Sequence, residues 1–146
     1  YRQVATVAAV SKAGATLTYR SLAPACALNG QQITPLTGVG ECAISVTSAG
    51  NATAAPLTVI LPIRLTLGAQ TLGAFALPET LKAFSKTNLP TATNFGEKVT
   101  YKAMGSCSVV RSVLTMRRGK CEITATAGAR KGLYEGLNTK LAVTGK

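Results

Sequence analysis

The sequence has no histidine, no tryptophan and no aspartate, and its five acidic residues are all glutamate. Histidine and aspartate supply most enzymatic acid–base chemistry, and calcium favours Asp-rich loops, so these functions lose their usual residues. Glu41 and Glu122 could act as a carboxylate pair only by facing one cleft, and no aspartate or histidine supports them. We therefore expect no enzyme activity, no cofactor and no metal site.

Long hydrophobic runs are also missing. The segment "LTVILPIRLTLGA", which starts at Leu57, is interrupted by Pro62 and Arg64, whereas a membrane-spanning helix needs roughly 18 or more apolar residues. The chain begins at Tyr1 with neither methionine nor a signal peptide, as a processed secreted chain or an excised piece would. The 47% hydrophobic content predicts packed cores, in one medium domain or two small ones.

Acidic charge is scarce and basic charge is abundant, giving a net charge of +11. Residues 1–67 hold four basic residues and one acid, or +3, and the remainder holds twelve and four, or +8. The densest basic set comprises Arg111, Arg117, Arg118 and Lys120, with Arg130 and Lys131 nearby in sequence. We expect it on or near the tip of a hairpin over 107–121, where it could bind an anionic glycan or form only a solvated turn. Nucleic-acid binding is not expected, because no aromatic residue interleaves the set.

The sequence contains an internal repeat. "GECAISVTSAG" at 40–50 has a near-copy in "GKCEITATAG" at 119–128, and "LTYRSLAPAC" at 17–26 matches "VTYKAMGSC" at 99–107. Six residues of the first copy correspond to six of the second with nearly equal spacing: Tyr19, Cys26, Gly40, Cys42, Ile44 and Gly50 to Tyr101, Cys107, Gly119, Cys121, Ile123 and Gly128. The repeat is roughly 80 residues long.

Both copies have the side-chain alternation of half-buried strands. In "ECAISVTS" and "KCEITATA" one face carries Cys42, Ile44 and Val46, and Cys121, Ile123 and Ala125, respectively. "QQITPL" and "SVLTM" come before them, separated by the glycine-containing turns "TGVG" and "RRG", as hairpins require. We therefore predict an all-β fold.

The four cysteines predict one disulfide in each copy. Pairing Cys26 with Cys42 and Cys107 with Cys121 would close loops of about 15 residues, each contributing roughly 3 kcal/mol. Two other connectivities remain possible, whereas a zinc site would need close C-x(2–4)-C pairs, which are absent. Disulfides imply an oxidising compartment, so we expect an extracellular chain, secreted or on a cell surface. Asn51 opens the only N-x-Thr sequon and could carry a glycan in a eukaryotic or archaeal host.

The order "VTY…C", hairpin, "G-x-C-x-I-x-A", glycine turn and final strand resembles the bacterial immunoglobulin-like tandem repeats of secreted and cell-surface proteins. The resemblance covers most of the chain, and the second copy is the closer match. It implies two tandem immunoglobulin-like β-sandwiches, at 1–67 and 68–146, each with one intra-domain disulfide. It implies no catalytic residue, since the family has none to carry over.

The segment before the second copy has no counterpart before the first. There, "TLGAFAL" at 71–77 is interpreted as a first strand, and "LPETLKAFSK" at 77–86 is the best helix candidate, with a strand and turn as the alternative. Aligning the tyrosines places residue 1 near residue 83, so the first copy lacks that strand and should expose an apolar groove. The chain could be part of a longer array, could manage with fewer strands, or could receive a strand from a neighbouring subunit, with 1–10 or 138–146 as donor.

These observations predict a structural or adhesive extracellular module, a stalk or filament subunit that assembles head-to-tail by strand donation. Its partners would be other copies of itself or other domains of the same surface protein, with no nucleic acid and no membrane span. The alternative is a module that attaches a secreted protein to an anionic polysaccharide through the basic hairpin 111–120.

Overall fold

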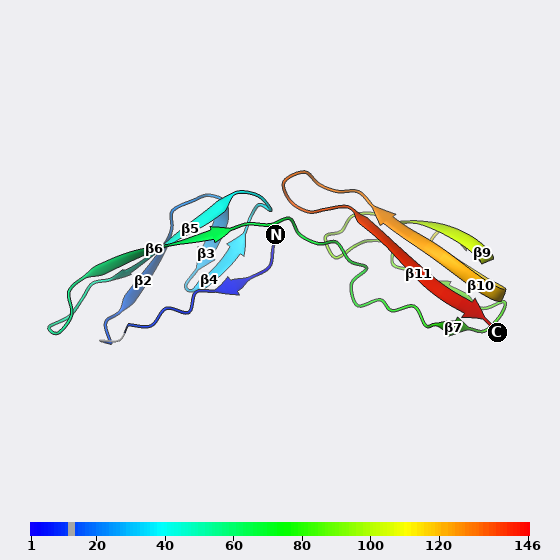
Figure 1. Cartoon of the computed structure of the whole chain (residues 1–146), viewed down its shortest axis with the longest axis horizontal. Helices are drawn as coiled ribbons and strands as arrows, with labels where there is room; N and C mark the ends of the chain where they lie inside the picture. Colours follow the sequence, from blue (N-terminus) through cyan, green and yellow to red (C-terminus); the bar gives the residue numbers. More distant parts are fainter. Residues whose placement is uncertain (12–13) are drawn as a thin grey trace. The chain divides into compact units, whose positions relative to one another are not determined.

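The computed structural model describes residues 1–11 and 14–146, and every regular element in them is a β-strand (Figure 1). The chain divides into two compact units. Unit 1 consists of Tyr1–Gly68 and Lys131–Tyr134, and unit 2 consists of Ala69–Arg130 and Glu135–Lys146. A short piece of the second half of the sequence therefore belongs to the first unit.

Unit 1 contains two three-stranded antiparallel sheets. One has the order β1-β4-β3 and the other β2-β5-β6. The strands are β1 (Ala5–Thr6), β2 (Leu17–Ser21), β3 (Cys26–Asn29), β4 (Gln32–Pro35), β5 (Glu41–Ser48) and β6 (Leu57–Arg64). Side chains from both sheets meet in one core, which includes Ile33 of β4 and Ile44 of β5. The alternation expected for "ECAISVTS" is present, since Cys42, Ile44 and Val46 are buried.

Three of the strands of unit 2 are longer than any strand of unit 1. The strands of unit 2 are β7 (Thr80–Leu81), β8 (Lys86–Asn88), β9 (Thr100–Val110), β10 (Val113–Ala127) and β11 (Leu137–Gly145). The sheet has the order β7-β11-β10-β8, and β9 also pairs with β10. All pairings are antiparallel except that of β7 with β11. The main core gathers Leu114, Met116, Ile123 and Val143.

The two units share their pairing registers. Three cross-strand pairs of unit 1 recur in unit 2: Tyr19–Val46, Ser48–Leu57 and Cys42–Ile63 match Tyr101–Ala125, Ala127–Leu137 and Cys121–Val143. β1 against β4 likewise matches β8 against β10. The internal repeat in the sequence is therefore a repeat of strand pairing as well.

Three segments differ from the structure first expected for them. Residues 77–86 form no helix, since Phe84 has φ 64°, which breaks any right-handed helix, and they follow the strand-and-turn alternative, with β7 followed by a turn. Residues 71–77 are not a regular strand, although Phe75 and Leu77 still pack against the core. The apolar side chains of this irregular segment contact the core. Apolar spacing alone does not distinguish such a segment from a strand.

The third concerns "RRG" at 117–119, which is not a hairpin turn. It lies inside β10, where the register against β9 shifts between Met116 and Cys121. Gly105 faces this bulge with φ 91°, and a Cβ there would lie 2.5 Å from the Lys120 carbonyl oxygen. The turn itself is at Arg111 and Ser112, whose positive φ angles suit a two-residue hairpin connection.

Candidate functional site

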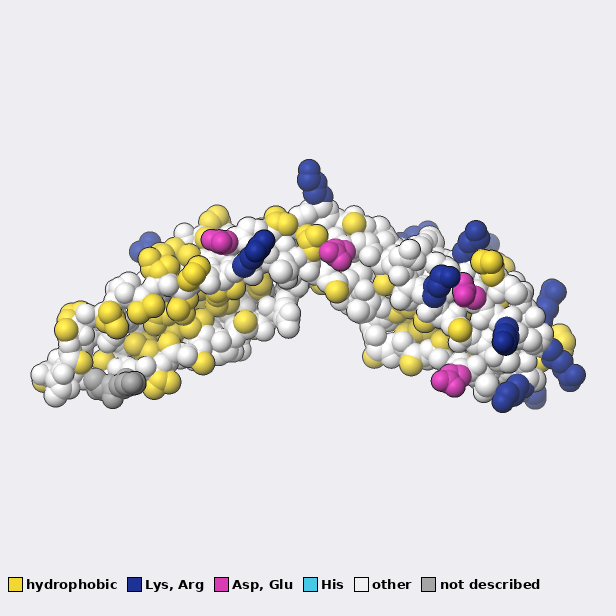
Figure 2. Space-filling view, viewed as in Figure 1, with side chains coloured by type: hydrophobic (Ala, Val, Ile, Leu, Met, Phe, Trp, Pro, Cys, Tyr) yellow, Lys and Arg dark blue, Asp and Glu magenta, His cyan; other side chains and the backbone are white. Residues whose placement is uncertain are grey.

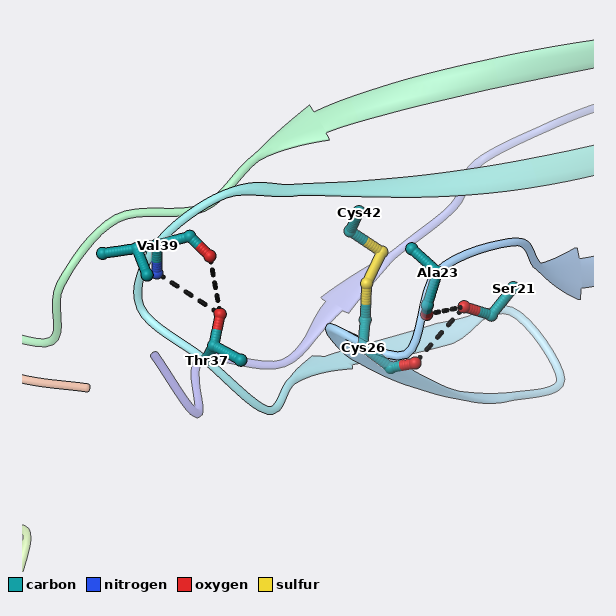
Figure 3. Close-up of a disulfide and its surroundings, with 6 residues drawn as sticks. All are labelled: Ser21, Ala23, Cys26, Thr37, Val39 and Cys42. Atoms are coloured by element: carbon teal, nitrogen blue, oxygen red, sulfur yellow. Dashed lines mark hydrogen bonds between the residues drawn. A yellow bond between two sulfur atoms is a disulfide. The ribbon is translucent and has the colours of Figure 1, made fainter. Parts of the chain in front are cut away.

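Each unit is closed by one disulfide, in the pairing expected from the sequence. Cys26 of β3 is bonded to Cys42 of β5, and Cys107 to Cys121, with Cα separations of 5.9 and 5.6 Å. Figure 3 shows the first bond joining strands of the two different sheets of unit 1. Beside it the Ser21 hydroxyl donates to the Cys26 carbonyl at 3.3 Å. Bonds of this kind form in an oxidising environment.

An apolar groove of about 490 Å³ opens on unit 1, as expected for a first copy that lacks a strand. The groove is lined by Ser11, Leu17, Val46, Ala55, Leu57 and Val59, among others. It runs along β6, which is the last strand of its sheet. Figure 2 shows hydrophobic side chains gathered over this unit, on the face where Figure 1 places β6.

The groove exposes large apolar side chains. Val10 is 88% exposed, Leu57 62% and Val59 43%. Natural proteins usually protect the edge strand of a sheet with charges, bulges or covering segments, and contiguous exposed apolar surface marks an interaction site. The groove is therefore the surface of unit 1 best suited to another polypeptide.

Residues 69–77 cover the corresponding face of unit 2. Leu72 packs against the buried side chains of Val99, Ala125 and Leu137. At the start of this segment Gln70 is buried and makes three side-chain hydrogen bonds, two to the β10–β11 connection and one to Thr93 in the β8–β9 connection. Leu72 therefore covers this face of unit 2 with an apolar contact, and Gln70 holds the start of the segment by hydrogen bonds.

The six basic residues predicted as one set are spread over three places. Arg111 lies in the β9–β10 turn, Arg117, Arg118 and Lys120 lie about the bulge of β10, and Arg130 and Lys131 follow the far end of that strand. From Lys120 to Ala127 the strand rises about 23 Å at its usual spacing. Arg130 and Lys131 are also assigned to different units. No single basic hairpin tip therefore forms.

Three of the six do remain together. Arg117, Arg118 and Lys120 are all exposed, and none forms a salt bridge within the described parts of the chain. Figure 2 shows Lys and Arg side chains more densely on unit 2 than on unit 1. A short stretch of strand at the bulge therefore presents three positive charges to solvent.

No protein-family model and no curated protein matches the sequence. The candidate site thus depends on the groove and the exposed charges. Across residues 1–11 and 14–146 no three His, Cys, Asp or Glu side chains lie close enough to hold a metal ion. In the same residues no helix has the length and apolar character needed to cross a membrane.

Two titratable side chains, Glu122 and Tyr101, form hydrogen bonds with neighbouring residues. Glu122 accepts a hydrogen bond from Lys140 at 2.9 Å on the exposed surface of β10 and β11, while Glu41 lies in β5 of unit 1. Burial raises the pKa of Tyr101, whose hydroxyl donates to the Pro90 carbonyl at 2.8 Å. Both contacts lie within unit 2.

Sequence reasoning missed Ser11 and Gln70. Ser11 lines the groove in unit 1, and Thr93 occupies the same place in unit 2. Both precede the tyrosine of their copy by eight residues, which is a spacing that could have paired them. Gln70 gave no signal, because its partners Gly128 and Glu135 lie 58 and 65 positions away.

Proposed function

We propose that the protein is a structural or adhesive extracellular module, a stalk or filament subunit of a surface appendage built from two immunoglobulin-like β-sandwiches. The observation that carries this proposal is the disulfide in each unit, which in unit 1 ties one sheet to the other. Disulfides form in an oxidising compartment, which supports a secreted or surface-displayed protein.

Such a unit suits mechanical load. Extending unit 1 requires loss of the β5–β6 ladder, which pairs eight residues of each strand, and in unit 2 the β10–β11 ladder pairs nine. The loop between bonded cysteines cannot extend while the disulfide is intact. Stretching single molecules between their ends tests the role, because each unit should resist extension and release less chain than its length when oxidised.

The exposed edge strand supports assembly. In this proposal neighbouring polypeptides join the module by adding a strand beside β6, as in other strand-addition complexes. Neither end of the chain is placed to be the donor, since residues 5–6 pair with β4 and residues 137–145 pair with β10 in their own units. The added strand would therefore come from elsewhere.

A second role is attachment to an anionic polysaccharide. It is favoured by Arg117, Arg118 and Lys120, which are exposed together at the bulge of β10. Retention on an immobilised polyanion that falls steeply with salt tests this role, because counterion and ligand compete for the same side chains.

A further inference from the structure

Unit 2 provides a template for what fits the groove of unit 1. The residues beneath the groove have counterparts at the same register positions: Leu17, Val46, Ser48 and Leu57 correspond to Val99, Ala125, Ala127 and Leu137. In unit 2 this floor is buried, with Leu137 only 8% exposed, whereas Leu57 is 62% exposed. The difference is that residues 69–77 lie over the floor in unit 2.

The groove has a polar end at Ser11, and Thr93 is its counterpart in unit 2. In unit 1 the Gly14 amide donates to the Ser11 carbonyl at 3.2 Å, and in unit 2 the Gly96 amide donates to the Thr93 carbonyl at 2.9 Å. Both hydroxyls also accept from the amide four residues farther on, Ser11 from Ala15 at 3.0 Å and Thr93 from Glu97 at 3.3 Å, so the two hydroxyls are placed alike. Ser11 lines the groove, so its hydroxyl lies where a segment entering the groove would begin.

In unit 2 the polar end holds a glutamine. The Gln70 amide nitrogen donates to the carbonyls of Gly128 at 2.6 Å and Glu135 at 2.7 Å, and the Thr93 hydroxyl donates to the Gln70 amide oxygen at 2.7 Å. By register the counterpart of Glu135 is Ala55, which also lines the groove. Unit 1 thus has Ser11 and Ala55 at the places of Thr93 and Glu135, which bind the glutamine side chain in unit 2.

The apolar part of the segment follows in a fixed order. Leu72 covers the floor, and Phe75 and Leu77 pack farther along, against the main core of unit 2. The chain then reaches β7, which runs parallel to β11. A segment placed likewise in unit 1 would run parallel to β6, starting near Ser11.

The described ends of the chain do not fill this place. The Tyr1 amino group donates to the Thr66 carbonyl at 3.0 Å, and the Val7 amide donates to the Gln31 carbonyl at 2.9 Å. Residues 69–77 are themselves packed in unit 2. No segment within residues 1–11 and 14–146 therefore occupies this place.

We propose that the groove binds an extended, uncharged peptide segment with the pattern Gln-x-Leu-x-x-Phe-x-Leu, supplied by a neighbouring protein of the same appendage. Residues 69–77 show that pattern and carry no charge, which matches a groove lined by uncharged side chains. This inference rests on the proposed structural role, because it names the partner that joins β6.

The test uses the full oxidised chain and a synthetic peptide with the sequence of residues 69–78, labelled for fluorescence anisotropy. We expect one peptide per chain, at least tenfold weaker binding to the Leu57→Glu variant and unchanged binding to Ile60→Glu. Ile60 is the matched control, since it is 58% exposed on the same strand and its side chain points to the opposite face. Peptides with Leu72→Asp or Gln70→Ala should bind at least tenfold and several-fold more weakly, respectively.

A fusion of residues 69–82 ahead of Tyr1 keeps the test decisive if the free peptide binds weakly, because tethering raises its effective concentration. The fusion should slow hydrogen exchange in β6, and the same fusion with Leu72→Asp should not.

Equal effects of Leu57→Glu and Ile60→Glu on peptide binding, or no response to either peptide or fusion, would overturn the proposal. Self-association of the chain alone that Leu57→Glu abolishes would also overturn it, by assigning the groove to a second copy. None of these outcomes alters resistance to stretching, which tests the structural role separately.

Discussion

Leu57 and Leu137 hold the same cross-strand position in the two units, facing Ser48 and Ala127, but Leu57 is 62% exposed and Leu137 only 8%. The same residue type in the same register therefore has two environments. Leu72 helps to account for the difference, because it packs against the cluster that contains Leu137 in unit 2.

Truncating these leucines should have unequal effects. We expect Leu137→Ala to lower the free energy of unfolding of unit 2 by about 2–4 kcal/mol, since it leaves a cavity under Leu72. Leu57→Ala should change that of unit 1 by less than about 0.5 kcal/mol, as is usual for exposed side chains. Hydrogen-exchange mass spectrometry reports on each unit separately, and equal losses in both would contradict the assignment of the groove as uncovered surface.

Tyr101 predicts a loss of stability at alkaline pH. Burial raises the pKa of its hydroxyl above the ordinary value of 10.0, so the folded state favours the neutral phenol. The resulting stabilisation is complete below pH 10 and is lost as pH rises through the pKa of the folded state. Denaturant titrations between pH 8 and about 11 should therefore give a smaller fall in stability for Tyr101→Phe than for the parent chain.

The two proteins are compared by the change of their stability with pH and not by their stability at one pH. Tyr101→Phe also loses the hydrogen bond to Pro90, a constant cost of about 1 kcal/mol that is present at every pH below the transition. Parallel pH profiles for the two proteins would refute the predicted role of Tyr101.

The charges at the bulge predict salt-sensitive retention on polyanions. We expect the double variant Arg117→Ala, Arg118→Ala to elute from an immobilised sulfated polysaccharide at clearly lower salt than the parent. Arg130→Ala, Lys131→Ala removes the same charge from residues beyond the far end of β10 and serves as the control. Equal shifts for the two would show dependence on net charge alone and argue against a site at the bulge.

Much of the fold follows from local pattern. The alternation of Cys42, Ile44 and Val46 predicted a half-buried strand, and β5 buries those side chains. The cysteine spacing predicted the pairing found in both units. The lack of a counterpart to "TLGAFAL" predicted an apolar groove in the first copy, and the groove lies there.

The failures occur where distant contacts decide the structure. In residues 77–86, Pro78 and Glu79 suited the first turn of a helix, but Leu81 pairs with Gly145 in β7, so the strand-and-turn alternative formed. "RRG" resembles a turn, yet Gly105 on the facing strand allows a bulge there instead. That substitution of bulge for turn is also why Arg111 and Arg117 do not share one hairpin tip.

The most direct test of the central claim is single-molecule stretching of the chain between its ends, oxidised and then reduced. We predict two discrete unfolding events, and after reduction a gain in extension of about 50 Å for unit 1 and about 43 Å for unit 2. These gains are the lengths of 16 and 14 residues at about 3.5 Å each, less the Cα separations of 5.9 and 5.6 Å between the bonded cysteines. Smooth extension without discrete events, or lengths that do not change on reduction, would contradict a pair of disulfide-closed, load-bearing units.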